Sequence, residues 1–180
     1  LCYTIDMCRG DEAWNSSQVW YMPFDDLNAE VTSDITWWPW REWYYTINVC
    51  NFAISRCGED NSQLSNKMKR IKGQVLFLRG LSYYNLVGYY QNPPLITDYA
   101  TYSSLDGLYT TNSTYDNVLD QVEKDFHEAM ELLPSRDEGG EWAGGRATCG
   151  AAAGYYARAL MMRQKYSDAL TVLKDRKSTR

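Results

Sequence analysis

The segment from Leu64 to Ile96 constrains the fold of this chain more than any other. Apolar residues recur along it at helical spacing in two rows: Leu64, Met68, Ile71, Val75 and Leu78, and then Phe77, Leu81 and Tyr84. An apolar face of this width predicts a helix that is buried on two sides. Pro93 and Pro94 end the helix, because proline cannot continue the hydrogen-bond ladder. The sequence therefore predicts a central helix of roughly 25 residues, about twice the mean helix length of globular proteins.

Two glycines of this segment, Gly73 and Gly80, are seven residues apart and lie close to one line along the helix. Each costs about 1 kcal/mol relative to alanine in a helix interior. We expect the compensation to be a second helix packed closely against that line.

Helical periodicity continues in the rest of the chain, where four further helices are predicted. The first begins near Pro39 and ends before Gly58, the second is capped by Ser113 and ends before Pro134, the third is capped by Thr148, and the fourth covers residues 166–174. Their short connections predict antiparallel neighbours. The fold class is therefore all-α, a tetratricopeptide-like helical-repeat array with long irregular loops.

The remaining segments lack this periodicity. Residues 95–112 and 135–145 are expected to be loops, and long loops on helical scaffolds are a common place for binding. We divide the chain into an irregular N-terminal segment that packs on the repeats (1–36), the helical-repeat domain (37–175) and a tail (176–180).

Composition excludes several classes of function. A net charge of −5 without a Lys/Arg cluster argues against nucleic-acid binding. Apolar runs are too short for a membrane-spanning helix. The five cysteines, at positions 2, 8, 50, 57 and 149, lack metal-ligand spacing and are expected to be small buried apolar residues. We predict no metal site and no cofactor.

Enzymatic motifs are also missing from the sequence. The single histidine, His127, lies among carboxylates on a polar helix face, and no nucleophile is paired with a base. The stretch from Gly140 to Thr148 resembles a phosphate-binding loop but lacks the lysine. Carboxylates adjacent in sequence, such as Asp25 and Asp26, point apart, whereas glycosidases need two that face each other. We predict that the chain is not an enzyme.

Three stretches resemble one family in order and distance. Residues 73–87, GQVLFLRGLSYYNLV, followed by Pro94-Leu95-Ile96, are similar to the G-E-A-x-F-L-R-A-x-x-Y-F-x-L-v … v-P-L-i pattern of SusD/RagB-type outer-membrane lipoproteins. Residues 125–134, DFHEAMELLP, and residues 145–152, GRATCGAA, are similar to two later family motifs. The chain is identified as a member of this family over residues 30–173, with Gln74 and Gly80 in place of the usual Glu and Ala.

The resemblance implies a SusD-like helical-repeat fold and a cell-surface lipoprotein of the outer membrane. It implies capture of a polysaccharide, an oligosaccharide or a peptide, and delivery to a SusC-type TonB-dependent transporter. The lipid anchor is not visible in this chain, because Cys2 is not in a recognisable lipobox. The alternative is a tetratricopeptide-type scaffold that docks to the transporter, or binds peptides, without binding sugar itself.

Aromatic residues outside the helix faces are the candidates for ligand contact, since sugar rings stack their C–H faces on Trp and Tyr. The chain has seven Trp and fifteen Tyr, more than an array of short helices needs for its core. The candidates lie at a helix start or in predicted loops: Trp14, Trp20, Trp37, Trp38, Trp40, Tyr99, Tyr102, Tyr109 and Trp142. Helix-face aromatics such as Tyr84 are interpreted as core.

Two arginines, Arg79 and Arg146, stand inside otherwise apolar or small-residue motifs. Each either contacts a ligand or makes a charge-assisted bond to a carboxylate or a helix C-terminus that locks two repeats together. The structural interpretation is the one we favour.

Overall fold

The computed structural model describes residues 34–58, 60–102, 104, 109–138 and 144–177, together with Gly10 and Met22. These residues form helices and connections without a strand, so the predicted all-α fold class is confirmed. The long helices are α3 (Asp34–Cys57), α4 (Asn66–Tyr90), α6 (Tyr115–Leu132), α7 (Cys149–Met162) and α8 (Tyr166–Lys177). The short ones are the single-turn α5 (Tyr99–Tyr102) and the 3-10 turns η1 (Asn61–Gln63) and η3 (Arg136–Glu138).

The chain divides into two compact units, Leu1–Tyr45 and Thr46–Arg180. The boundary lies inside α3, so the first half of this helix belongs to one unit and the second half to the other. The second unit contains the helical array.

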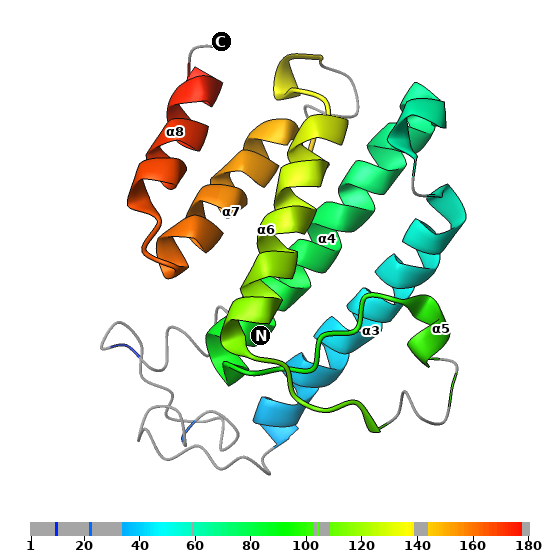
Figure 1. Cartoon of the computed structure of the whole chain (residues 1–180), viewed down its shortest axis with the longest axis vertical. Coiled ribbons are helices and arrows are strands. Elements are labelled where there is room, and N and C mark those ends of the chain that lie inside the picture. The colour runs from blue at the N-terminus through cyan, green and yellow to red at the C-terminus, as the bar shows by residue number, and fades with distance from the viewer. Residues whose placement is uncertain are drawn as a thin grey trace. The chain divides into compact units, whose positions relative to one another are not determined.

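Helix α4 is the central helix that the sequence predicts (Figure 1). It has 25 residues and begins after Ser65, whose hydroxyl accepts a hydrogen bond from the Met68 amide at 3.3 Å. It ends at Tyr90, and the positive φ of Gln91 (62°) turns the chain toward Pro93.

Gly73 and Gly80 of α4 face α6 and the residue that follows it, as the sequence predicts. A methyl group added at Gly73 would lie 2.9 Å from Leu133 Cγ, and one added at Gly80 would lie 3.1 Å from Phe126 Cε1. Gly80 comes after Gly73 in the sequence, whereas its neighbour Phe126 comes before Leu133, the neighbour of Gly73. The two helices are therefore antiparallel. The glycines let their backbones approach closely.

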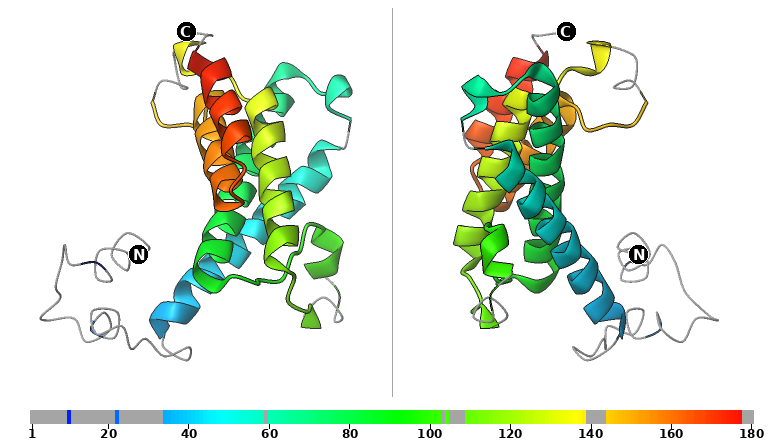
Figure 2. Two further views of the ribbon diagram at one scale, coloured as in Figure 1. Left: turned by 60° about the vertical axis from the view of Figure 1, so that its left-hand side comes forward. Right: turned by 90° about the vertical axis from the view of Figure 1, so that its right-hand side faces the viewer.

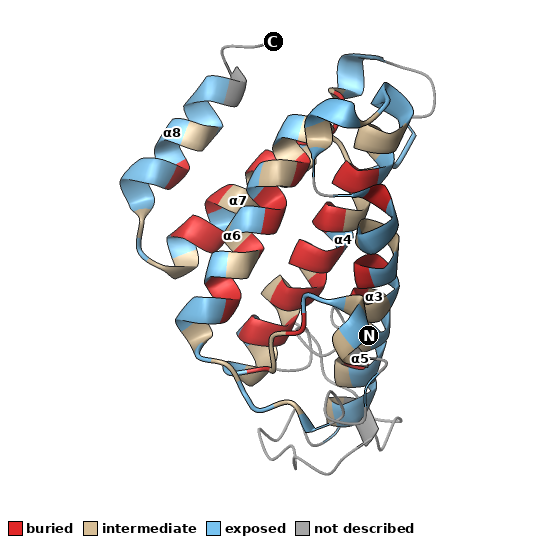
Figure 3. Cartoon of the chain, turned by 45° about the vertical axis from the view of Figure 1, so that its right-hand side comes forward, coloured by how far each residue is buried: buried red, intermediate tan, exposed pale blue. Residues whose placement is uncertain are grey.

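Two antiparallel helix pairs, α4 with α6 and α7 with α8, stack side by side (Figures 1 and 2). Their joint core includes Phe126 of α6, which stacks on Tyr155 of α7 at 5.6 Å between ring centroids. Between α7 and α8 lies a smaller cluster of Ala157, Leu160 and Ala169. Figure 3 shows buried residues where α4, α6 and α7 face each other and a largely exposed α8.

Two predicted helix starts are wrong. Helix α3 begins at Asp34, so Pro39 lies inside it and not in its first turn. Thr114 caps α6 by accepting a hydrogen bond from the Asn117 amide, whereas the Ser113 hydroxyl is engaged by the Leu95 amide at 3.1 Å. A cap chosen from sequence spacing fails when another segment takes the hydroxyl.

The cysteine interpretation is confirmed for Cys50, Cys57 and Cys149, which are buried free thiols. Burial raises the pKa of the Cys50 thiol to about 11, which keeps it protonated and unreactive. Cys2 and Cys8 lie outside the described residues. In the part of the chain that the structure describes, no helix is both long and apolar enough to span a membrane.

We expect Gly73→Ala to destabilise the fold by up to about 2 kcal/mol. Overpacking against Leu133 costs about 1 to 3 kcal/mol, and the gain in helix propensity offsets only about 1 of it. Gly88→Ala on the same helix is the control, because an added methyl group there meets nothing within 4 Å and should stabilise by up to about 1 kcal/mol. Urea unfolding followed by tryptophan fluorescence measures both, and equal stabilisation by the two changes would contradict the close approach.

Candidate functional site

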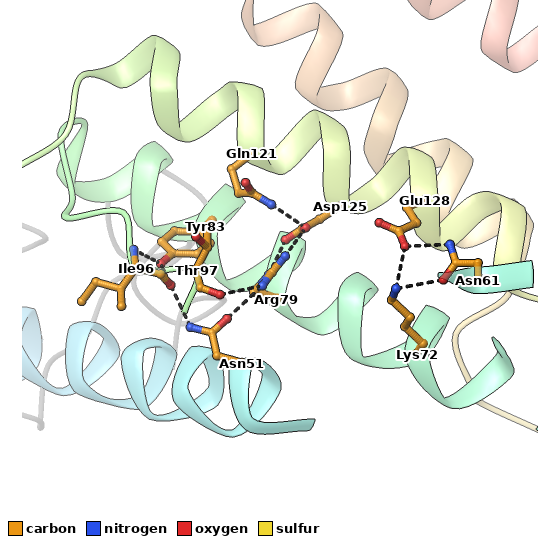
Figure 4. A network of polar contacts seen from close by, with 10 residues as sticks. All are labelled: Asn51, Asn61, Lys72, Arg79, Tyr83, Ile96, Thr97, Gln121, Asp125 and Glu128. Atoms are coloured by element: carbon orange, nitrogen blue, oxygen red, sulfur yellow. Dashed lines mark hydrogen bonds and ion pairs between the residues drawn. The ribbon is translucent and has the colours of Figure 1, made fainter. Parts of the chain in front are cut away.

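A buried ion pair between Arg79 of α4 and Asp125 of α6 lies at the centre of a polar network (Figure 4). The guanidinium binds the carboxylate in two places, Nη2 to Oδ1 at 2.6 Å and Nε to Oδ2 at 2.8 Å. Gln121 donates a further hydrogen bond to Oδ1 at 2.7 Å. Although burial acts to lower the pKa of Arg79, the bonds and charge of Asp125 outweigh it and raise that pKa, so Arg79 stays charged.

The same guanidinium links these helices to α3 and to the loop after the double proline. Arg79 Nη1 donates to Asn51 Oδ1 at 2.9 Å and to the Thr97 carbonyl at 3.4 Å. Asn51 in turn donates to the Ile96 carbonyl at 2.8 Å. The buried Tyr83 hydroxyl donates to that carbonyl and accepts from the Ile96 amide, both at 2.8 Å. The backbone at Ile96 and Thr97 is thus held by three side chains (Figure 4).

The loop that starts here is also closed at its other end. The Leu95 amide donates to Ser113 Oγ, and the Ser113 amide donates to the Pro93 carbonyl at 3.4 Å. Between these ends lie the predicted ligand residues Tyr99, Tyr102 and Tyr109. The polar network therefore positions the base of a loop that carries candidate aromatics.

A second polar network is centred on Lys72, which lies about two helical turns before Arg79 on α4. Lys72 donates to the Gly58 carbonyl at 3.1 Å and to Asn61 Oδ1 at 2.8 Å, and it pairs with Glu128 at 3.2 Å. Asn61 Nδ2 donates to Glu128 Oε1 at 2.9 Å. Burial acts to raise the pKa of Glu128, but the bonds from Asn61 and Lys72 outweigh it and hold that pKa below its usual value. Glu128 thus ties α6 to the connection between α3 and α4.

The predicted tryptophans of α3 lie in its first two turns. Trp37 and Trp38 are each 50% exposed, and the Arg41 guanidinium lies over the Trp37 ring at 4.9 Å. Trp40 packs against Tyr44 at 4.9 Å between ring centroids and is partly buried. Trp37 and Trp38 therefore offer more free ring surface than Trp40.

Of the loop candidates whose side chains the structure describes, Tyr109 is the more open, with 86% of its surface exposed. Tyr99 and Tyr102 lie at the two ends of the single turn α5, and the Tyr99 ring meets Phe52 of α3 edge-on at 5.0 Å. Trp14, Trp20, Trp142 and the side chain of Tyr102 lie outside the described residues.

Sequence reasoning predicts a carboxylate or a helix C-terminus as the partner of Arg79. The structure shows a carboxylate, that of Asp125, which the sequence does not identify. A signal for it exists, because Asp125 falls on the apolar row of α6 with Val118, Val122 and Ala129. A charge on such a row needs a buried partner. Arg146 donates a hydrogen bond to the side-chain amide oxygen of Gln74 on α4 at 3.2 Å.

The polar networks around Arg79 and Lys72 hold helices and loops together through hydrogen bonds and ion pairs. In the residues that the structure describes, no three His, Cys, Asp or Glu side chains gather in a way that would hold a metal ion. The features suited to ligand contact are the exposed aromatic rings.

Comparison with known families identifies the family of this chain. The SusD-like family model described as "Starch-binding associating with outer membrane" matches residues 3–161. The chain belongs to the SusD-like family. No curated protein matches the sequence significantly.

Solved structures of SusD-like proteins share the fold of this SusD-like chain. A SusD-like carbohydrate-binding protein from Bacteroides fragilis is 23% identical, with a TM-score of 0.75 over 93% of this chain and 31% of its own. A SusD superfamily protein from Bacteroides vulgatus is 21% identical, with a TM-score of 0.82 over 96% and 36%. Surface glycan-binding protein A from Bacteroides fluxus is 18% identical, with a TM-score of 0.80 over 98% and 37%. The SusD-like chain thus spans about a third of the length of these proteins.

We expect Asp125→Asn to destabilise this SusD-like fold by about 3 to 5 kcal/mol, because it leaves the buried Arg79 charge without a counter-charge. Arg70→Leu on the same helix is the control. It removes an exposed ion pair with Glu138 and should change the free energy of unfolding by less than about 1 kcal/mol. Chemical denaturation measures both, and similar small effects would refute a central role for the buried pair.

The stability contributed by Glu128 should be lost in acid. Since its folded-state pKa is lowered from 4.5, the charged form stabilises the fold above that pH, and the contribution disappears as the pH falls through the lowered value. Glu128→Gln should cost about 1 kcal/mol at neutral pH, and this difference from wild type should shrink and disappear as the pH falls through the lowered pKa of Glu128. Glu131→Gln, at an exposed position, is the control. A difference that does not depend on pH would contradict the assignment.

Proposed function

We propose that the protein binds glycans at the cell surface, capturing a polysaccharide or oligosaccharide and delivering it to a SusC-type TonB-dependent transporter. It performs no catalysis. It lies in the outer membrane as a surface-exposed lipoprotein, held by a lipid anchor that this sequence does not show. Support comes from the family description and from the names of two solved relatives, which refer to carbohydrate and surface-glycan binding.

The observation that carries the proposal is the exposure of large aromatic rings. Trp37 and Trp38 are each half-exposed and Tyr109 is almost fully exposed, although each ring would gain free energy from burial in a core. Flat aromatic faces open to solvent suit the C–H faces of sugar rings. Tyr109 also stands on a loop whose base is fixed by buried hydrogen bonds, which limits the entropy lost on binding.

The alternative function is a scaffold that docks to the transporter, or binds peptides, without binding sugar. One observation favours it: Tyr166, Leu170 and Leu173 are exposed and follow one another at helical spacing on α8. An apolar row on an outer helix suits contact with a partner protein.

Substitution separates the two functions. We expect the double change Trp37→Ala and Trp38→Ala, or Tyr109→Ala, to weaken retention in polysaccharide-containing gels by about tenfold, with transporter association kept. Tyr166→Ala removes an equally exposed aromatic ring elsewhere and should leave retention unchanged. Affinity gel electrophoresis measures retention and co-purification measures docking. If the α3 and loop variants lose docking but keep retention, these aromatics serve the scaffold function.

A further inference from the structure

Three tyrosines and one arginine gather where α4, α6 and α7 meet: Tyr84, Tyr115, Tyr155 and Arg158, here called the tyrosine–arginine cluster. The Tyr84 and Tyr155 rings meet edge to face at 5.7 Å, and the Arg158 guanidinium lies 5.4 Å from the centre of the Tyr155 ring. Burial raises the pKa of Tyr84, and the charges of Arg158, Tyr155 and Tyr115 also act on it. The tyrosines are half-buried and Arg158 is exposed.

The floor of the cluster is rigid. Tyr155 stacks on Phe126 of α6 at 5.6 Å and meets Phe77 of α4 edge-on at 5.7 Å. Phe77 and Phe126 belong to the buried core. The orientation of the Tyr155 ring is therefore fixed before any ligand arrives, which lowers the entropic cost of binding.

The polar ends of the cluster have unused bonding capacity. Within the described part of the chain, the hydroxyls of Tyr84, Tyr115 and Tyr155 make no hydrogen bond to the protein, unlike the Tyr83 hydroxyl, which makes two. Half-buried hydroxyls of this kind are available to hydroxyl groups of a ligand.

Arg158 has no carboxylate partner among the described residues, although α6 carries several acidic side chains. Those acids are taken by other cations: Arg163 binds Asp116, Asp120 and Glu123, and Lys165 binds Glu123 at 2.9 Å. A guanidinium that is held over an aromatic ring and lacks a counter-charge suits a planar anion, which it can bind in two places.

We propose that the tyrosine–arginine cluster is a binding site for an acidic glycan. Arg158 pairs with the carboxylate or sulfate group of the sugar, and the three tyrosine hydroxyls bond its hydroxyl groups. The site deepens the proposed function and rests on it, because it names an acidic class of glycan and a second place of contact apart from Trp37, Trp38 and Tyr109. The sequence interpretation of Tyr84 as a core residue is thereby revised.

Affinity electrophoresis of the full chain through gels that contain polygalacturonate, dextran sulfate or starch tests the site. The chain has a net charge of −5, so general electrostatics oppose retention by either polyanion. We expect Arg158→Ala to weaken retention by an acidic polysaccharide about tenfold and Tyr84→Phe to weaken it less, with retention by starch unchanged. Retention by polygalacturonate alone identifies a carboxylate ligand, and retention by dextran sulfate alone identifies a sulfate.

Arg136→Ala is the matched control, because Arg136 is also exposed and has no carboxylate partner among the described residues. Equal loss of retention in Arg158→Ala and Arg136→Ala would overturn the site, since only overall charge would then matter. If Trp38→Ala weakens retention by starch but Arg158→Ala does not change retention in the acidic gels, the site is overturned and the proposed function stands. No retention in any gel would overturn both.

Discussion

The ion pair between Arg79 and Asp125 is the interaction on which the rest of the structure depends. Two charges in a dry interior are stable only when every donor and acceptor around them is satisfied. Here that requires Asn51 from α3, the carbonyl of Thr97 from the loop and Gln121 from α6 to be in place together. Helices α4 and α6 can therefore pack around this pair only when α3 and the loop at Thr97 are also in place. This requirement favours one arrangement of the array over alternatives.

The sequence predicts most of this fold because helical periodicity is strong and local. The length of α4 and the close approach at Gly73 and Gly80 follow from residue spacing and from the cost of glycine in a helix. Burial on two sides does not follow, because Ile71 and Leu78 of the first predicted apolar row are exposed. The starts of α3 and α6 do not. The Ser113 hydroxyl is taken by the Leu95 amide, 18 residues earlier, and no local pattern reports a contact over that distance.

The site is predictable in kind and less so in detail. Composition and loop position select Trp37, Trp38 and Tyr109, and the structure places all three rings in solvent. Residue spacing does not predict contacts between segments far apart in the sequence, such as that between Phe52 and Tyr99. Periodicity also cannot tell a buried ring from a half-buried one, so Tyr84 resembles a core residue until α7 brings Tyr155 and Arg158 beside it.

The double anchoring of the loop after Pro94 has an evolutionary consequence. Its first residues are held by Tyr83, Asn51 and Arg79, and its two ends are joined through Ser113. The interactions that fix the two ends are thus made mostly by helix residues outside the stretch between Thr97 and Ser113. Insertions and exchanges between Thr97 and Ser113 cost little folding free energy, because loop closure depends only weakly on length. One helical array can in this way present many different loops, and new recognition can arise by grafting without redesign of the core.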